Sequence, residues 1–248
     1  MIGAAWPAGY ALLEFDEIDS TNEEARRRAA SGEKGPLWIV AKHQTSGRGR
    51  RGRSWQSPTG NLAATLLLRP DRSAAECAQL SFAAALAVSD MLAALAPQAD
   101  FTLKWPNDIL AVGRKIAGIL LESESGANGR IAWLAAGIGV NLASYPDDTE
   151  FLAIALATLG VLPPDPKDAL LHLAAAFAKW YDVWRAQGFL PVREAWLSRA
   201  AGLGKRIRAR LAKEEIKGVF QGIDDSGALL LGLPGGVSRA ISAGEVFF

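Results

Sequence analysis

The amino-acid sequence predicts an α+β protein in which a mixed β-sheet flanked by helices is followed by a small all-β module. Over residues 1–201, apolar runs of strand length alternate with longer alanine- and leucine-rich stretches of helical length. Two of these runs are separated by Asn128 and Gly129, a pair that strongly favours a hairpin turn. Residues 202–248 contain only short strand-like runs and turns, so we expect two domains divided at this point.

The N-terminal part is predicted to form a short helix followed by two strands. Residues 19–22 (Asp-Ser-Thr-Asn) offer helix-capping side chains, two glutamates follow in the first turn, and arginines occupy the last turn before Gly32. Residues 37–42 and 61–68 are apolar, strand-like runs. They lie on either side of a loop that is rich in arginine and glycine.

The middle of the chain is predicted to contain a long helix, the rest of the sheet and further helices. Ser73 and Glu76 form a capping box that opens an alanine- and leucine-rich helix ending near Pro97. The later elements are, in order, a strand at 101–105, a turn at 106–108, strands at 116–121 and 131–142, and helices at 149–159, 167–186 and 192–201.

The C-terminal module is predicted to be a small barrel. Its strands are expected at 206–211, 216–223, 228–233 and 239–248, with turns at 225–227 and 234–236. Because so short a segment buries little surface by itself, we expect it to pack against the larger domain.

The composition is that of a folded globular protein, since half of the 248 residues are hydrophobic and 21% are charged. The 27 lysines and arginines nearly balance the 26 aspartates and glutamates, so no general attraction to nucleic acid or to an anionic membrane follows. Cys77 is the single cysteine, which excludes an internal disulfide and favours a buried hydrophobe. His43 and His172 are too few and too isolated to suggest a metal centre.

The N-terminus lacks the basic segment, apolar core and cleavage site of a secretory signal, and no apolar run reaches membrane-spanning length. We therefore expect a cytoplasmic, reducing location.

The most distinctive segment is the arginine loop at 47–55, Gly-Arg-Gly-Arg-Arg-Gly-Arg-Ser-Trp. Glycine lets a backbone approach a ligand closely, whereas arginine offers a planar fork of donors to phosphate or carboxylate. The loop is therefore suited to close over a small anionic ligand or to lie on a nucleic acid.

Two known phosphate-binding motifs do not fit the arginine loop. Gly47, Gly49 and Gly52 have the spacing of the dinucleotide-binding fingerprint, which needs a helix directly after the glycines. Pro58 and Gly60 prevent that helix, so a pyrophosphate would have no helix N-terminus to bind. A P-loop is excluded because Arg and Ser, rather than Lys and Ser or Thr, follow the last glycine.

A nucleic-acid contact would suit arginines clustered beside Trp55, which could hold phosphates and stack on a base. No helix-turn-helix, zinc-finger or RNA-binding signature accompanies them, and the net charge is only +1. For the arginines taken alone, a solvated basic loop is the simpler explanation.

Further motifs occur in a fixed order along the chain and change this interpretation. They are 19–22 (Asp-Ser-Thr-Asn), 104–108 (Lys-Trp-Pro-Asn-Asp), 114–120 (Arg-Lys-Ile-Ala-Gly-Ile-Leu), 137–142 (Gly-Ile-Gly-Val-Asn-Leu), 222–229 (Gly-Ile-Asp-Asp-Ser-Gly-Ala-Leu) and 244–245 (Gly-Glu). Together with the arginine loop, this ordered set closely resembles the biotin–protein ligases (biotin–[acetyl-CoA-carboxylase] ligases) over nearly the whole chain.

The resemblance implies a class II synthetase-like catalytic domain of the biotin ligase type, with an SH3-like β-barrel after residue 202. It also implies a two-step reaction. The biotin carboxylate attacks the α-phosphate of ATP to give biotinyl-5′-AMP, and a lysine of a biotin carboxyl carrier protein domain then takes the biotinyl group. ATP and Mg²⁺ are the implied cofactors, and the carrier domain of a carboxylase is the implied partner. Because two anions meet in the first step, cationic donors are the main requirement.

The resemblance assigns roles to individual residues. Lys115 is expected to bridge the carboxylate and the α-phosphate, and Arg50 is expected to be catalytic with it. The implied biotin-binding residues are Ser20, Thr21, Asn22, Gln44, Arg48, Gly49, Arg50, Lys115 and Gly118. The implied ATP-binding residues are Arg53, Trp55, Lys104, Asn107 and Asn141. No residue is assigned as the ligand of a protein-bound metal.

Simpler structural explanations exist for several of these residues. Lys115 alone could be an exposed hairpin lysine without a partner, and Trp55 could be a core anchor. Asn107 fits ordinary turn chemistry and Asn141 fits the end of a strand. Residues 20–22 are also explained as helix caps.

Two other functions remain open. A lipoate–protein ligase shares the fold and the adenylate chemistry, but its glycine-rich and histidine-containing motifs are absent. A binding module without catalysis would not need Lys104, Asn107 and Lys115. About fourteen residues precede the catalytic region, too few for the DNA-binding domain that many of these ligases carry, so we expect no nucleic-acid partner. No membrane partner is expected either, because no apolar run reaches membrane-spanning length. A homodimer through an exposed sheet edge is left open.

Overall fold

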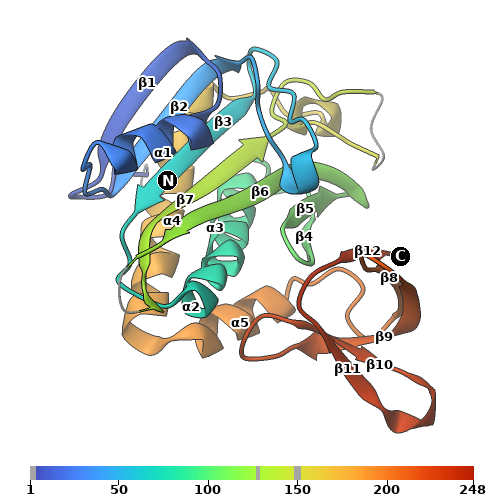
Figure 1. The fold of residues 1–248 in the computed structure, drawn as a ribbon. Helices are drawn as coiled ribbons and strands as arrows, with labels where there is room; N and C mark the ends of the chain where they lie inside the picture. Colours follow the sequence, from blue (N-terminus) through green and yellow to red (C-terminus); the bar gives the residue numbers. More distant parts are fainter. Residues whose placement is uncertain (1–3, 127–128, 148–151) are drawn as a thin grey trace.

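The computed structural model describes residues 4–126, 129–147 and 152–248. The strands of its large sheet are β1 (Ala11–Ile18), β2 (Leu37–Gln44), β3 (Leu62–Leu68), β4 (Phe101–Lys104), β5 (Asp108–Ala111), β6 (Arg114–Ser125) and β7 (Ile131–Val140). They lie in the order β1-β2-β3-β7-β6-β5-β4 (Figure 1). β1 and β2 run parallel, whereas the other described neighbours run antiparallel, so the predicted mixed sheet is confirmed.

Neither β1 nor β5 is predicted by an apolar run of its own. β1 mixes apolar and acidic residues without a regular alternation and lies at the edge of the sheet, where none of its side chains is fully buried. β5 has four residues and begins at Asp108, inside the predicted turn. Both segments become strands because neighbouring strands supply their backbone hydrogen bonds, which a local sequence pattern does not record.

Helices cover both faces of the large sheet (Figure 1). On one face α1 (Thr21–Ala30) packs Ala25 and Ala29 against Ile39 and Trp133. The helices of the opposite face are α2 (Ala74–Ala78), α3 (Leu80–Leu95), α4 (Pro166–Gln187) and α5 (Phe189–Leu197). The larger core on that side includes the buried side chains of Trp38, Leu66, Leu86, Phe177 and Trp196.

The predicted capping signals are confirmed at the N-termini of α1 and α2. The Ser20 hydroxyl accepts a hydrogen bond from the Glu23 N–H at the start of α1, and the capping box of Ser73 and Glu76 opens α2. Cys77 on α2 is buried as expected, and burial raises the pKa of its thiol to about 11.

The segment Ala74–Leu95 corrects one expectation from the sequence. It contains an 18-residue window with a mean hydropathy of 1.6, which by length and composition alone is enough to cross a membrane. In the fold 61% of this window is buried, against the sheet and the neighbouring helices. An apolar helix that is covered by its own protein is the usual form of a core helix, and we interpret it so.

The helix predicted at 149–159 is wrong in the part that the structure describes. Residues 152–155 are extended, and only Leu156–Leu159 forms a short 3₁₀ helix; residues 149–151 lie outside the described residues. The extended segment pairs with the start of β6, since the Lys115 N–H donates to the Leu152 carbonyl (2.8 Å) and the Ile154 N–H donates to the Lys115 carbonyl (3.0 Å). A short apolar run is ambiguous between helix and strand, and here the neighbouring backbone decides.

The C-terminal segment folds into a second, antiparallel sheet that fits the expected SH3-like fold. Its strands are β8 (Arg206–Arg210), β9 (Glu215–Ile223), β10 (Leu229–Gly232), β11 (Ser238–Ile241) and β12 (Glu245–Phe247), in the order β11-β10-β9-β8-β12. The single strand predicted at 239–248 is therefore two strands, which lie at opposite edges. Four Cα steps from Ile241 to Glu245 span at most about 14 Å, less than the roughly 19 Å width of a flat five-stranded sheet, so the sheet must curl.

The two sheets share one apolar core. Side chains of the C-terminal sheet such as Ile207 and Leu231 belong to the same buried cluster as those of α3 and α5. A hydrogen bond from the buried Trp105 indole N–H to the Gly227 carbonyl (3.0 Å) joins the two parts, which confirms the expected packing. The division into domains at residues 1–201 and 202–248 stays a prediction.

Candidate active site

A pocket of about 400 Å³ lies on the α1 face of the large sheet, between the arginine loop and β12. Figure 1 shows this loop extending from β2 and β3 over β5 and β6 towards the C-terminal sheet. The pocket is lined by all of the residues assigned to the site from the sequence: Ser20, Thr21, Asn22, Gln44, Arg48, Gly49, Arg50, Arg53, Trp55, Lys104, Asn107, Lys115, Gly118 and Asn141. The fold thus brings together residues that are widely separated in the sequence.

Glycines of β6 and β7 form the floor of the pocket. A Cβ atom at Gly139 would overlap the Trp55 ring, and one at Gly137 would overlap the Asn22 amide. Because alternate strand residues face the same side, Gly137 and Gly139 leave this face open while Ile138 between them is buried in the core. Two glycines at strand spacing were a signal for this floor, although neither was assigned to the site.

The side chain of Lys115 lies inside the pocket rather than in solvent. Its Nζ atom is 2.6 Å from Oδ1 of Asp108 and 5.5 Å from the ring centroid of Trp55. A Cβ at Gly118 would stand 3.0 Å from the Lys115 Cε and Nζ atoms, so Gly118 leaves room for the lysine. The simpler explanation of an exposed lysine without a partner is therefore wrong. Asp108, interpreted from the sequence as a turn residue, is the partner.

The arginine loop is a narrow hairpin-like turn. The Gly49 N–H donates to the Arg53 carbonyl (2.7 Å), and the Trp55 N–H donates to the Gly47 carbonyl (2.9 Å). Arg51 at the tip has a φ of 58°. Residues other than glycine rarely adopt this left-handed conformation, and here the tight turn requires it. No helix follows Gly52 before β3, so the rejection of the dinucleotide fingerprint is confirmed.

Each arginine of the loop has an anchor elsewhere in the fold. Nη2 of Arg48 lies 3.0 Å from Glu23 on α1 and 3.4 Å from Glu122 on β6, and Nη1 of Arg50 donates to Oδ1 of Asn107 (3.0 Å). At the other end of the loop three arginines converge on a single carboxylate of β12, that of Glu245; these arginines are Arg51, Arg53 and Arg210.

Burial and pairing shift the pKa values of two of these groups. Burial lowers the pKa of the Arg50 guanidinium from its ordinary value. Burial pushes the pKa of Glu245 upwards, but the hydrogen bonds from Arg210 and Arg53 outweigh it, so the net pKa lies below the ordinary value. Glu245 and Glu122 were not assigned to the site from the sequence, and only the closing Gly-Glu motif pointed to Glu245.

Buried hydroxyl and amide groups fill the end of the pocket beneath α1. The Gln44 Oε1 atom accepts from the Thr21 N–H (2.8 Å), while its Nε2 atom donates to the Ser57 hydroxyl (3.1 Å). The Thr65 hydroxyl lies 2.8 Å from that of Thr21 and 2.6 Å from Oδ1 of Asn22. Ser20 both caps α1 and lines the pocket, so its capping and ligand-facing roles are compatible.

At the opposite end the assigned residues are held mainly by protein contacts. The Asn141 amide is buried and donates to the Ile154 carbonyl (3.1 Å), which ties β7 to the segment beside Lys115. The Asn107 amide donates to the Ile119 carbonyl (2.6 Å). Lys104 is 8% exposed, and its Nζ atom lies 5.6 Å from the centroid of the Phe247 ring.

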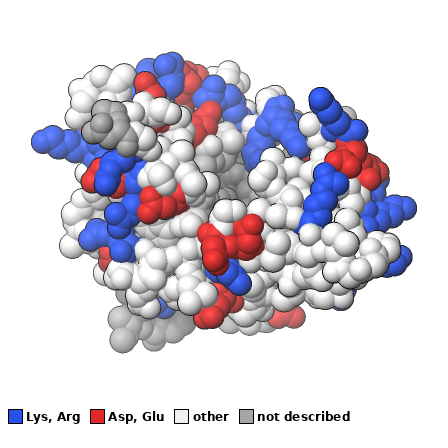
Figure 2. Space-filling model, turned by 60° about the horizontal axis from the view of Figure 1, so that its bottom comes forward, with Lys and Arg blue, Asp and Glu red and all other residues white. Residues whose placement is uncertain are grey.

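Opposite charges are mixed on the surface of the protein. On the face drawn in Figure 2, acidic and basic side chains are interspersed rather than separated into one basic field. Within residues 4–126, 129–147 and 152–248, no three His, Cys, Asp or Glu side chains are grouped so as to hold a metal ion. The arrangement can therefore bind an anion at the arginine loop and a neutral polar group beneath α1.

Two family models match the chain. The model described as "Biotin/lipoate A/B protein ligase family" matches residues 14–141, and the model described as "Biotin protein ligase C terminal domain" matches residues 202–248. Together they contain the arginine loop, Lys115 and Glu245.

Relatives and solved structures agree with these models. The chain is 49% identical to a biotin–[acetyl-CoA-carboxylase] ligase of Paracoccus denitrificans, with 93% of this chain and 97% of the relative covered. It is 35% identical to the bifunctional ligase/repressor BirA of Bacillus subtilis, with 95% of this chain and 73% of the relative covered. A biotin protein ligase of Aquifex aeolicus, solved with biotin and ATP, has a TM-score of 0.81, 28% identity and coverage of 96% and 97%. One from Leishmania major, solved with biotinyl-5-AMP, has a TM-score of 0.66, 26% identity and coverage of 96% and 100%.

Proposed function

The chain belongs to the biotin/lipoate A/B protein ligase family, and we propose that it activates biotin with ATP as biotinyl-5′-AMP and transfers it to a lysine of a carrier domain of a carboxylase. The observation that carries this proposal is the position of Lys115. Its ammonium lies in the same pocket as the polar groups beneath α1 and the arginine loop. A cation between a site for a neutral ring and a site for phosphates is what adenylate formation needs.

In the first step the biotin carboxylate oxygen bonds to the α-phosphorus, and pyrophosphate leaves. Lys115 is proposed to leave Asp108 and lie between the two anions, so that its charge offsets the repulsion on approach and in the transition state. Arg50, half-buried beside Asn107, is proposed to add a second cation at the same point. The partial burial of both groups strengthens these interactions, because less water competes for them than at the open surface.

Biotin is proposed to bind with its ureido ring beneath α1. The ring has two N–H donors and one carbonyl, which suit the hydroxyl and amide groups of Ser20, Thr21, Asn22 and Gln44. The glycine floor of β6 and β7, including Gly118, gives the apolar part of biotin a surface free of side chains. Arg48 and Gly49 are proposed to close over it from the loop.

ATP is proposed to occupy the part of the pocket nearer β12. Arg53 and Lys104 supply positive charge there, Trp55 supplies an aromatic surface, and Asn107 and Asn141 line the wall. Mg²⁺ is proposed to enter as the complex with the triphosphate, because the described residues form no carboxylate cage of their own. Among the pocket-lining side chains, Asn107 and Asp108 offer oxygen atoms to that ion, though both already accept contacts from Arg50 and Lys115.

In the second step the amine of a carrier lysine attacks the acyl carbon and AMP leaves. Arg50 and the arginine loop are proposed to retain the adenylate and to exclude water until the carrier arrives. We propose the biotin carboxyl carrier domain of a carboxylase as the partner and the cytoplasm as the location, where both ATP and reduced cysteine are present.

Incorporation of labelled biotin into a purified carrier domain, with and without ATP, tests this function. We expect ATP-dependent labelling by biotin and none by lipoate offered in its place. The control is the Lys115→Ala protein. It should still bind biotin, but it should label the carrier domain much more slowly than the wild type does. Labelling by lipoate alone would favour a lipoate ligase, and labelling by neither ligand would leave a binding protein; both results contradict the proposal.

A further inference from the structure

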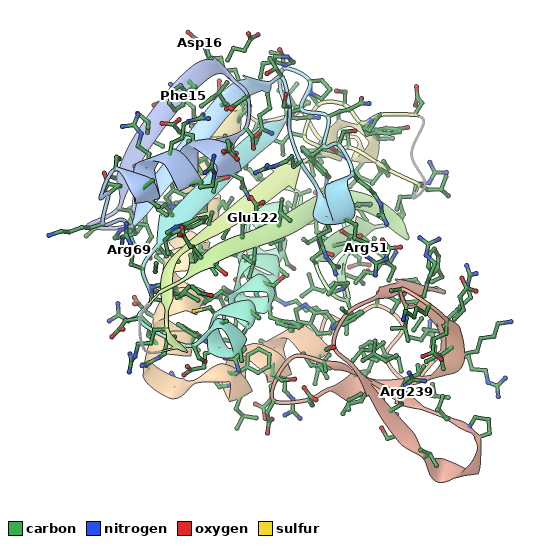
Figure 3. The ribbon with its side chains drawn as sticks, in the orientation of Figure 1. Phe15, Asp16, Arg51, Arg69, Glu122 and Arg239 are labelled. Atoms are coloured by element: carbon green, nitrogen blue, oxygen red, sulfur yellow. The ribbon has the colours of Figure 1, made fainter. Side chains whose placement is uncertain are left out.

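Glu122 of β6 touches two residues of the proposed biotin end without being part of any motif that assigned the site. Figure 3 shows Glu122 on the side of the sheet that α1 covers. Its Oε2 atom accepts a hydrogen bond from Nδ2 of Asn22 (2.7 Å), and Nη2 of Arg48 lies 3.4 Å from its two carboxylate oxygens. Its side chain is 35% exposed. One carboxylate therefore contacts both a buried amide on α1 and the arginine loop.

The contact with Glu122 fixes the direction of the Asn22 amide. A carboxylate can only accept hydrogen bonds, so the Nδ2 side of the amide must face it. The Leu120 carbonyl, 3.5 Å away, is a second acceptor on that same side. The Oδ1 atom then faces Thr65, whose hydroxyl donates to it (2.6 Å). Gly137 leaves just enough room for the amide, because a Cβ there would overlap it.

This direction decides where the protons of the next two hydroxyl groups point. The Thr65 hydroxyl has one proton, and the Asn22 oxygen takes it, so Thr65 has none to give to Thr21. The Thr21 hydroxyl points its own proton to Thr65 or to Oε1 of Gln44 (3.1 Å). The Thr21 hydroxyl oxygen consequently keeps a lone pair that accepts no hydrogen bond from Thr65 or Gln44. Thr21 lines the pocket, so this acceptor is available to a ligand N–H group.

We propose that Glu122 is a positioning residue for biotin, which holds the chain Asn22–Thr65–Thr21 in one direction so that Thr21 accepts an N–H of the ureido ring. The inference rests on the proposed function. If position 122 held an amide, which both donates and accepts, the Asn22 side chain could flip. Thr65 would then turn its proton to Thr21 and fill the lone pair that biotin needs.

Binding of biotin to the whole protein, measured by calorimetry without ATP, tests the proposal. Glu122→Gln should weaken biotin binding by about 10- to 100-fold, the range that a lost hydrogen bond in a buried site produces. The KM for ATP should change by less than about threefold, because Glu122 contacts no residue assigned to the nucleotide. A merely structural defect would instead lower the thermal midpoint and affect both ligands.

The matched control is Glu124→Gln. Glu124 lies two residues further along β6, and its Oε2 atom accepts from the Trp133 indole (2.7 Å), away from Asn22 and Arg48. It should bind biotin as the wild type does. Glu23→Gln removes the nearer carboxylate of Arg48 without touching Asn22, so it measures the share of the effect that comes through the loop.

A double mutant gives the sharpest test. Thr65→Val has no proton to turn towards Thr21, so Glu122→Gln should cause no further loss of biotin affinity in that background. Glu122→Asp remains acceptor-only and should bind biotin more tightly than Glu122→Gln. Additive losses in the double mutant, or unchanged affinity in Glu122→Gln beside a wild type that binds biotin, would overturn the inference alone. A wild type that binds no biotin would overturn the proposed function together with it.

Discussion

The Lys115 ammonium lies 2.6 Å from the Asp108 carboxylate inside the pocket, with the two side chains 23% and 13% exposed. A charge pair this little exposed is costly to break unless another charge replaces the partner. An incoming anion can take the place of Asp108 and leave the ammonium compensated. We therefore propose that Asp108 holds Lys115 in position before the reaction.

Lys115→Ala should leave the fold intact and lower biotin-dependent ATP–pyrophosphate exchange by about 100- to 1000-fold, the usual effect of removing one group that stabilises a transition-state charge. The matched control is Lys42→Ala, because Lys42 pairs with Asp16 at the surface and its side chain is 67% exposed. Exchange in the Lys115→Ala protein within about threefold of the wild type would remove Lys115 from the mechanism.

Arg50→Gly should increase the escape of biotinyl-5′-AMP into solution. Nη1 of Arg50 donates a hydrogen bond to Oδ1 of Asn107 (3.0 Å). Without this side chain, the middle of the loop loses its hydrogen bond to the wall of the pocket. Free adenylate can be measured as labelling of a bystander protein that has no carrier sequence. Arg72→Gly, at an arginine outside the pocket, should not raise bystander labelling. An unchanged adenylate lifetime in Arg50→Gly would contradict retention by this contact.

Local sequence patterns predicted the elements whose signals lie within a few residues. The cap at Ser20, the capping box at Ser73 and the apolar runs of β2, β3 and β7 all depend on neighbours in the chain. The ordered motifs also predicted which residues line the pocket, since all of those assigned do so. Their individual roles in binding and catalysis stay predictions.

The partners of those residues could not be predicted in the same way. Arg53 and Glu245 are 192 positions apart, and Asn22 and Glu122 are 100 apart, so no spacing rule links them. The helix prediction that is wrong at residues 152–155 has the same cause: these residues are extended because Lys115 offers them hydrogen bonds. Contacts between distant segments determine these ion pairs, hydrogen bonds and strand pairings. In a single sequence they are visible only as charged residues and apolar runs whose partners are unknown.

Gly139→Ala should destabilise the protein by about 1–3 kcal/mol, because the added methyl group overlaps the Trp55 ring and overpacking of a filled site costs about this much. The same substitution in a Trp55→Ala background should cost much less, because the ring is gone. Urea denaturation of the four proteins of this cycle measures the coupling. Additive free energies of unfolding would show that Trp55 does not rest on Gly139.

Glu245→Gln should remove a pH-dependent contribution to stability. Glu245 is 8% exposed and bonded to Arg53 and Arg210, and its folded-state pKa lies below the ordinary value of 4.5. A group with a lowered folded-state pKa stabilises the fold fully above its unfolded-state pKa, and this contribution is lost as the pH falls through the folded-state pKa. The wild type should therefore exceed Glu245→Gln in free energy of unfolding by about 1–3 kcal/mol at neutral pH. The difference should stay constant down to about pH 5 and shrink below the ordinary value of 4.5.

Urea denaturation at a series of pH values checks this expectation. The control is Glu214→Gln in the turn just before β9, because Glu214 pairs with Arg239 at the surface, where the two side chains are 49% and 43% exposed. Its effect should be much smaller, since water screens an exposed pair. Since Arg53 pairs with Glu245, Glu245→Gln should also raise the KM for ATP while biotin affinity changes little. Equal effects of the two substitutions on stability, or a difference that grows as the pH falls, would contradict the role given to Glu245 in joining the loop to the C-terminal sheet.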